Sequence, residues 1–140
     1  MDQLQLKLCD IQGRLFELSG KAGYSSPEFI RAFMTSNTAA GLDSSYNRLQ
    51  WAGEEYLLED VSETNNLPKG GDVYPGDALY WIGYLYRFWH FYKNADSRNI
   101  VRTAPPQTMK RNYTMFHSIE SELAVDDLIE IYEQKRQQAE

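Results

Sequence analysis

The chain has 140 residues, of which 42% are hydrophobic and 24% are charged, and it carries a formal net charge of −6. Its length is typical of one domain with one hydrophobic core, and its composition excludes an intrinsically disordered chain. The single cysteine, Cys9, excludes an internal disulfide framework, and we expect one soluble, cytoplasmic domain over residues 1–140.

The first segment predicts an amphipathic helix of about sixteen residues, because its apolar residues recur at four- and three-residue steps. Gly20 and Gly23 are expected to end it. Such spacing differs from the continuous apolar run of a secretory signal peptide. The apolar stripe consists of Leu4, Leu8, Ile11, Leu15 and Leu18.

Ser26 and Pro27 predict the start of a second helix, because serine is a preferred N-cap and proline is favoured at the first helical position. Residues 35–45 are expected to form a turn, followed by a third helix over residues 46–63. Residues 65–76 contain two prolines and three glycines and predict a loop. The buried face of the second helix is expected to hold Phe29, Ile30, Phe33 and Met34.

Asp77 predicts the N-cap of a fourth helix over residues 78–93. Residues 80–92 contain eight aromatic side chains, and a helix that is apolar nearly all round is normally central and buried. The run is too short and too polar to span a bilayer. Eight rings also exceed what one core stripe requires, so some are expected to reach a surface groove. The candidates for that groove are Tyr80, Tyr84, Tyr86, Trp89 and Tyr92.

Three further helices are predicted beyond residue 95. Asp96 or Ser97 begins a short helix, and the two prolines at residues 105–106 interrupt it and start the next one. Ser118 or Ser121 begins the last helix, and residues 134–140 are expected to be a frayed tail. The sequence therefore predicts an all-α, single-domain bundle of about six or seven helices around a central aromatic-rich helix.

Charge is unevenly distributed along the chain. Residues 41–80 carry eight acidic side chains against two basic ones, and residues 118–140 carry seven against two. Residues 81–117, by contrast, carry six basic side chains against one acidic one. The basic segment either pairs internally with the acidic ones or steers a charged partner.

Residues that often carry catalysis or metal binding are scarce. His90 and His117 have no Cys, Asp, Glu or His partner at the spacing of a metal motif, so we expect no metal and no cofactor. Nothing local activates Cys9 as a nucleophile. Residues 69–72 (KGGD) lack the spacing of a phosphate-binding loop. The basic residues Arg98, Arg102, Lys110 and Arg111 resemble a nucleic-acid-binding surface. The negative net charge of the chain argues against a nucleic-acid partner, because affinity for phosphates depends on positive charge.

Three segments resemble a family of small helical bacterial proteins that are regarded as antitoxin components of toxin–antitoxin modules. They are residues 46–59 (YNRLQWAGEEYLLE), 80–92 (YWIGYLYRFWHFY) and 111–117 (RNYTMFH). The resemblance covers residues 25–133. It implies a cytoplasmic protein that sequesters a cognate toxin, and it supplies no catalytic residues.

The leading functional hypothesis is a non-enzymatic protein-binding module whose partner is a toxin. One alternative is a phage or mobile-element inhibitor of a host defence protein, whose carboxylates mimic nucleic-acid phosphates. Another is a small helical enzyme in which Glu55, Arg87 and His90 cooperate in acid–base chemistry. The residues predicted to contact a protein partner are Trp51, Glu55, Arg87, Trp89 and His90.

Overall fold

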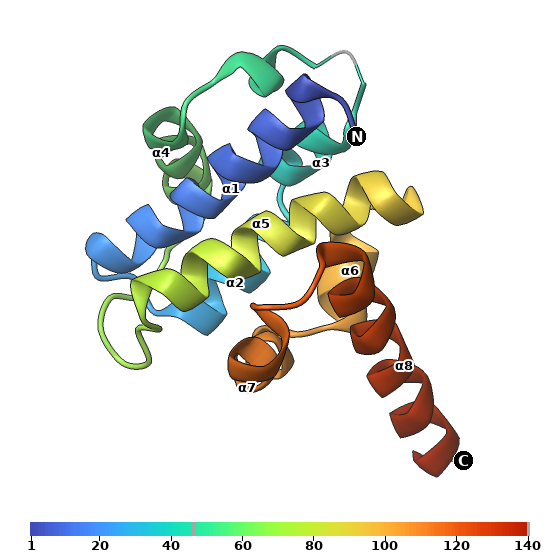
Figure 1. The fold of residues 1–140 in the computed structure, drawn as a ribbon. Helices are drawn as coiled ribbons and strands as arrows, with labels where there is room; N and C mark the ends of the chain where they lie inside the picture. The colour runs from blue at the N-terminus through green and yellow to red at the C-terminus, as the bar shows by residue number, and fades with distance from the viewer. Residues whose placement is uncertain (46, 140) are drawn as a thin grey trace.

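The computed structural model describes residues 1–45 and 47–139, and this part of the chain is all-α, with no strand (Figure 1). It contains eight α-helices and one short 3-10 helix, slightly more elements than the sequence predicts. The elements are α1 (Gln3–Lys21), α2 (Ser26–Met34), α3 (Asn37–Asp43), η1 (Arg48–Trp51), α4 (Glu54–Thr64), α5 (Gly76–Lys93), α6 (Ser97–Thr103), α7 (Pro106–Phe116) and α8 (Ser121–Ala139).

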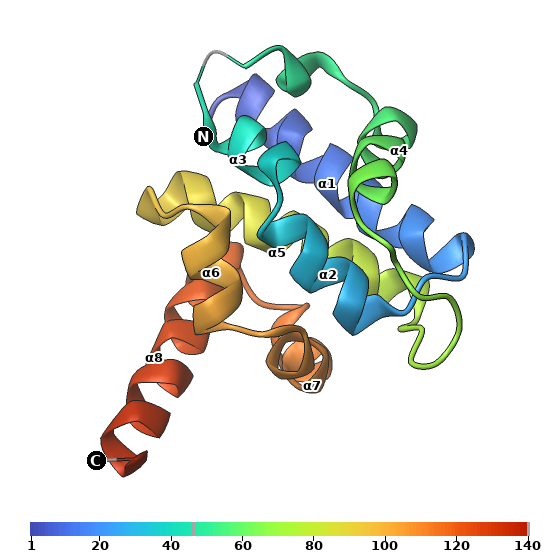
Figure 2. The same ribbon diagram turned by 180° about the vertical axis from the view of Figure 1, so that it is seen from behind.

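The aromatic-rich helix α5 lies at the centre of the bundle, as predicted. It runs antiparallel beside α1 along most of its length and also contacts α6, α7 and α8 (Figures 1 and 2). Helix α2 packs against α1, α3, α6 and α7. Helix α4 packs against α1 on the side away from α5 (Figure 1). Helix α8 touches the bundle near its first turns and then projects away from it (Figure 2).

Two glycines allow α1 and α5 to approach each other closely. A methyl group on Gly83 would lie 2.4 Å from the carbonyl oxygen of Gln12, and one on Gly13 would lie 2.8 Å from the ring of Tyr80. The Gln12 side-chain amide also donates to the carbonyl oxygen of Gly83 at 2.9 Å. Backbone contact at this crossing therefore requires the absence of a Cβ atom.

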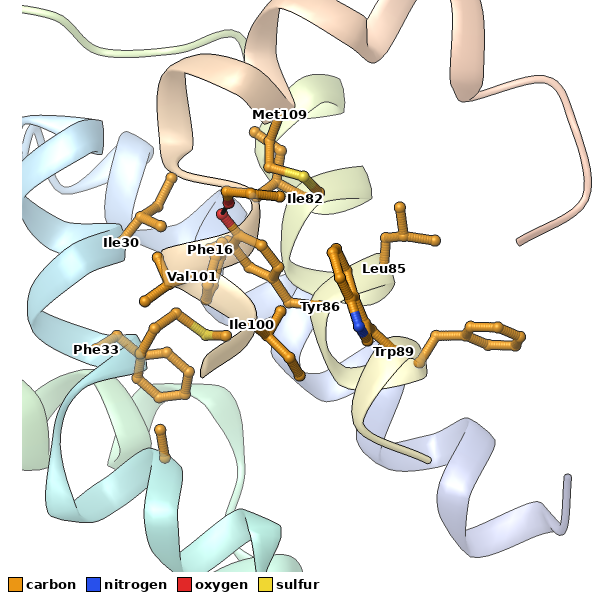
Figure 3. Close-up of a cluster of buried hydrophobic side chains, with 14 of the residues drawn as sticks. Phe16, Ile30, Phe33, Ile82, Leu85, Tyr86, Trp89, Ile100, Val101 and Met109 are labelled. Atoms are coloured by element: carbon orange, nitrogen blue, oxygen red, sulfur yellow. Dashed lines mark hydrogen bonds between the residues drawn. The ribbon is translucent and has the colours of Figure 1, made fainter. Parts of the chain in front are cut away.

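Aromatic rings fill the core between α1, α2 and α5. The ring of Phe16 meets Phe29 and Phe33 edge to face, each at a centroid distance of 5.5 Å. Tyr86 packs into the same cluster (Figure 3) and donates its hydroxyl to the carbonyl oxygen of Ala104 at 2.5 Å. This hydrogen bond offsets the cost of burying a phenol in an apolar core.

The region after α2 differs from the predicted turn and single long helix. Residues 37–43 form α3, which the side chain of Ser36 caps by accepting from the Ala39 N–H at 3.1 Å. The predicted helix over residues 46–63 is instead interrupted: η1 ends at Trp51, Ala52 and Gly53 are extended, and α4 begins at Glu54. Residue 46 itself lies outside the described residues.

Several predicted helix ends move by one or more residues. Ser25 occupies the N-cap of α2, while the Ser26 hydroxyl accepts from the Tyr74 N–H at 2.9 Å and secures the following loop. Asp77 lies in the first turn of α5 rather than at its N-cap. Asp96 caps α6, which resolves one predicted alternative.

The C-terminal segment is helical rather than frayed. Helix α8 continues to Ala139, so the predicted tail at residues 134–140 is wrong for its described part, and residue 140 lies outside the described residues. None of the helices in the described residues is long and apolar enough to cross a membrane.

Candidate binding surface

A buried polar network holds Arg87 inside the bundle, where it is 1% exposed. Its Nε donates to Gln12 Oε1 at 2.8 Å and its Nη1 donates to Asp43 Oδ1 at 2.6 Å. Nη2 donates to Ser97 Oγ at 3.3 Å, and the Ser97 hydroxyl donates in turn to Asp43 at 2.8 Å. Burial lowers the pKa of Arg87, and the charge of Asp43 opposes that shift. The network joins α1, α3, α5 and α6.

His90 and Trp89 also have positions that stabilise the bundle. His90 Nδ1 lies 2.7 Å from the carbonyl oxygen of Ala95 and 3.6 Å from Asp43 Oδ1. Because a carbonyl oxygen only accepts, Nδ1 carries the proton in this contact. Trp89 is buried in the core (Figure 3). The positions of Arg87 and Trp89 contradict the prediction that they contact a partner, and His90 is mostly buried.

The three residues of the enzyme hypothesis do not come together. Arg87 and His90 both approach Asp43, whereas Glu55 is exposed in the first turn of α4. Within the described residues, no hydrogen bond or ion pair joins Glu55 to Arg87 or His90. The acid–base constellation built on these three side chains is therefore wrong in its geometry.

Trp51, in contrast, is accessible on the surface, as a contact residue has to be. It is 74% exposed at the end of η1, and Tyr56 on α4 is also exposed. The two rings, with Leu49 and neighbouring residues, line a shallow groove of about 310 Å³. An exposed tryptophan beside a tyrosine is typical of a protein-binding hot spot.

A second groove lies between α5, α7 and the start of α8, with a volume of about 400 Å³. We call it the aromatic groove. Most of its lining is aromatic or apolar, and it contains one carboxylate and no lysine or arginine. Its lining residues are Asp77, Tyr80, Trp81, Tyr84, Tyr113, His117, Ile119 and Ser121.

Ring contacts hold the wall of the aromatic groove in place. Trp81 meets Tyr113 edge to face at a centroid distance of 5.8 Å, and Tyr113 stacks on His117 at 4.3 Å. His117 Nδ1 also lies 2.7 Å from the carbonyl oxygen of Tyr113. Tyr80 and Tyr84 lie one helical turn apart with centroids 6.1 Å apart. The groove is therefore largely formed before any ligand binds.

A third, polar groove of about 550 Å³ adjoins the aromatic groove, and both are lined by Tyr80. The Tyr80 hydroxyl donates to Asp10 Oδ1 at 2.5 Å, and Arg14 pairs with the other oxygen of Asp10 at 2.9 Å. Burial and this hydrogen bond raise the pKa of Tyr80, so its hydroxyl stays neutral. The polar groove is lined by Asp10, Arg14, Glu17, Leu18, Lys21, Glu54, Glu55 and Tyr80.

The predicted surplus of aromatic residues on α5 is partly correct. Tyr80 and Tyr84 line the aromatic groove and Tyr92 is exposed, but Tyr86 and Trp89 are buried. Sequence reasoning missed the contribution of α7 and the residues after it, which supply Tyr113, His117 and Ile119. The four-residue spacing of Tyr113 and His117 places both on one helix face, but only the fold brings that face beside α5.

Within the described residues, no group of three His, Cys, Asp or Glu side chains is arranged to hold a metal ion. No protein-family model, curated protein or solved structure matches the chain. The three grooves carry partly or fully exposed rings together with several carboxylates.

Proposed function

We propose that this protein is a non-enzymatic binding module that neutralises a cognate protein, as an antitoxin does, by covering part of its surface. The observation that carries the proposal is the aromatic groove, a concave surface with four aromatic rings and no convergent catalytic group. Tyrosine and tryptophan contribute large buried area at low cost in side-chain entropy when a partner covers them. The resemblance of residues 46–59, 80–92 and 111–117 to antitoxins agrees with this function.

The aromatic and polar grooves share a lining residue, so one partner can cover both of them. The polar groove shares Tyr80 with the aromatic groove, and its Glu54 and Glu55 lie between Trp51 and Tyr56 in the chain. Helices α7 and α8, which border the aromatic groove, also carry the exposed apolar side chains Met115 and Leu123. Stable interfaces bury about 800 Å² on each partner around a few aromatic anchors.

The proposal is tested by co-expressing the protein with the product of the neighbouring gene and purifying through a tag on one of them. We expect a stoichiometric complex that survives size-exclusion chromatography, and growth rescue if the partner is a toxin. Ile119→Asp places a charge on the rim of the aromatic groove and should weaken the complex by more than tenfold, because burying an unpaired charge is costly.

Leu6→Asp is the matched control, because Leu6 on α1 is similarly exposed, at 43% against 38% for Ile119, and does not line any of the three grooves. This variant should bind normally. A chain that remains alone with every neighbouring product would overturn the proposal, and equal loss of binding in both variants would exclude the aromatic groove as the contact.

The acidic outer surface of α4 favours one alternative partner, a defence protein that handles nucleic acid. Glu55, Glu59 and Glu63 are exposed on this helix and can occupy sites that otherwise accept phosphates. Such a complex should weaken steeply with salt and compete with nucleic acid. Charge-neutral variants of Glu59 and Glu63, which line none of the three grooves, should weaken it strongly, whereas the antitoxin-like complex should lose little.

A further inference from the structure

We propose that the aromatic groove binds an arginine-bearing apolar segment of the partner protein, with the guanidinium group against the tyrosine and tryptophan rings of α5. This inference rests on the proposed function, because it specifies the chemistry of the segment that occupies the groove. Three features of the groove support it: rings without an internal cation, carboxylates at its edge, and an apolar rim.

Four tyrosines outside the groove already have a cation of the chain itself over the ring. Within the described residues, a lysine or arginine lies over each of four tyrosines at 4.6–5.7 Å from the ring centroid, and none of these tyrosines lines the groove. They are Tyr24, Tyr74, Tyr92 and Tyr132. No lysine or arginine of the described residues lies over Tyr80, Trp81 or Tyr84 in this way. All three rings are partly exposed in the groove lining, so a cation from outside can approach them.

Carboxylates at the edge of the groove make it attractive to positive charge. Asp77 lines it directly, and Asp10 accepts from the Tyr80 hydroxyl at the boundary with the polar groove. Burial raises the pKa of Tyr84, and nearby negative groups including Asp10 and Glu122 raise it further. Across the aromatic and polar grooves there are five carboxylates and two cationic side chains, so an anionic ligand is disfavoured.

The rest of the groove favours an apolar neighbour for the cation. Ile119 lies in the lining and is partly exposed, and Leu123 is exposed on the first turns of α8. The groove volume of about 400 Å³ lies within the range typical of small-molecule binding sites. It can therefore hold an arginine side chain together with part of an apolar neighbour. Arginine suits the rings better than lysine because its planar guanidinium stacks on aromatic faces and is more weakly hydrated.

The three tryptophans give an internal readout for an experiment in solution. Trp81 lines the groove, Trp51 lies in a different groove, and Trp89 is buried in the core. The probe is the capped tripeptide acetyl-leucyl-arginyl-leucine amide, titrated into the full chain while the indole N–H signals are followed by nuclear magnetic resonance. Signals are assigned with single tryptophan-to-phenylalanine variants.

We expect the arginyl peptide to shift the Trp81 signal saturably while the Trp89 signal stays in place. The same peptide with citrulline, which has the shape of arginine without its charge, should bind roughly fivefold more weakly, as expected for a cation–π contact at a partly exposed site. A glutamyl peptide should not bind. Equal binding of the arginyl and citrulline peptides would overturn the inference, as would a peptide-induced shift confined to Trp51.

Two variants separate the ring from general charge. Tyr84→Leu keeps an apolar side chain but removes the ring, and Asp77→Asn removes one carboxylate; each should weaken the arginyl peptide by about threefold or more. Asp127→Asn is the control, because this carboxylate is exposed on α8 and does not line the groove. Unchanged binding in both groove variants would contradict the inference.

Failure of this experiment is distinguishable from failure of the proposed function. If a cognate protein co-purifies and depends on Ile119 while the peptides leave Trp81 unmoved, the protein is a binding module whose groove takes another segment. If the Trp81 signal instead moves with protein concentration alone, a second copy of the chain occupies the groove and the inference is wrong.

Discussion

Arg87 carries its charge into the interior, where Gln12, Asp43 and Ser97 accept its hydrogen bonds. We expect Arg87→Met to lower the free energy of unfolding by about 3–5 kcal/mol, because Asp43 then loses the cation that compensates its partly buried charge. Urea denaturation of the purified variant measures this loss.

The control for this substitution is Arg14→Met, which breaks the exposed ion pair with Asp10. Exposed pairs contribute about 1 kcal/mol or less, so this variant should retain nearly all of the stability. If Arg87→Met and Arg14→Met lost similar amounts of unfolding free energy, the buried network would contribute no more to stability than an exposed ion pair. The double variant Arg87→Met with Asp43→Asn should lose less stability than the sum of the losses in the two single variants, because the two side chains interact directly.

Cys9 is buried, and burial raises the pKa of its thiol from 9.0 to about 12. We expect the native thiol to resist an exposed-thiol reagent at pH 8 and to react at the rate of unfolding. Its raised pKa also affects stability, because above pH 9 the unfolded chain releases this proton while the folded chain keeps it.

The contribution of Cys9 is therefore fully present below pH 9 and is lost as the pH rises towards 12. In thermal or urea unfolding between pH 9 and 10.5, the wild-type chain should lose stability more steeply than Cys9→Ala, by up to about 1.4 kcal/mol for each pH unit. Tyr86, whose pKa burial also raises, is common to both proteins. Parallel pH profiles would refute this assignment.

At the level of elements, the crossing of α1 and α5 depends on glycine. Gly83→Ala should improve helix propensity by about 1 kcal/mol, but its methyl group would meet the Gln12 backbone at 2.4 Å. We expect a net loss of about 2 kcal/mol or more in urea denaturation, since backbone atoms cannot yield as a flexible side chain does.

Gly76→Ala provides the comparison on the same helix. Its Cβ would meet nothing closer than 3.5 Å, and that neighbour is the side chain of Glu17. This variant should change the stability by about 0.5 kcal/mol or less. If Gly83→Ala were equally harmless, the close packing of α1 against α5 would not limit stability.

Local signals explain why some elements were predictable and others were not. The apolar stripe of α1 and the proline in the first turn of α2 are local signals, since a few neighbouring residues are enough to predict each helix. Helix α3 has seven residues and a glycine at position 41, so its own pattern is weak. The break at residues 52–53 lies beside η1, which packs against α3, and sequence periodicity does not report such tertiary contacts.

For the whole molecule, the structure shows one of the two predicted uses of the segmental charge, internal pairing, and leaves the other as a proposal. Arg87 pairs with Asp43 and Lys93 lies 3.3 Å from Asp126, so part of the basic segment neutralises the acidic ones internally. Several carboxylates of the polar groove have no such partner within the described ion pairs, among them Glu54 and Glu55. Their charge is available to attract a partner.

Helix α8 projects from the bundle, and residues 133–139 are exposed (Figure 2). A chain that ends at Glu133 should therefore keep its melting temperature within about 2 °C, because little apolar surface is lost. Differential scanning calorimetry measures this. A fall of 5 °C or more would mean that the last turns support the bundle through contacts near Tyr132 and Pro105.

The sequence by itself determined the helical class, the central position of α5 and the presence of surplus rings, since periodicity and ring count are local properties. It also proposed Trp51 as a contact residue, and the structure leaves that side chain exposed. Only the tertiary structure decided that Arg87 and Trp89 are interior, and that α7 completes the aromatic groove beside Tyr80 and Tyr84. Burial and convergence depend on which distant segments pack together, and a one-dimensional pattern does not contain that information.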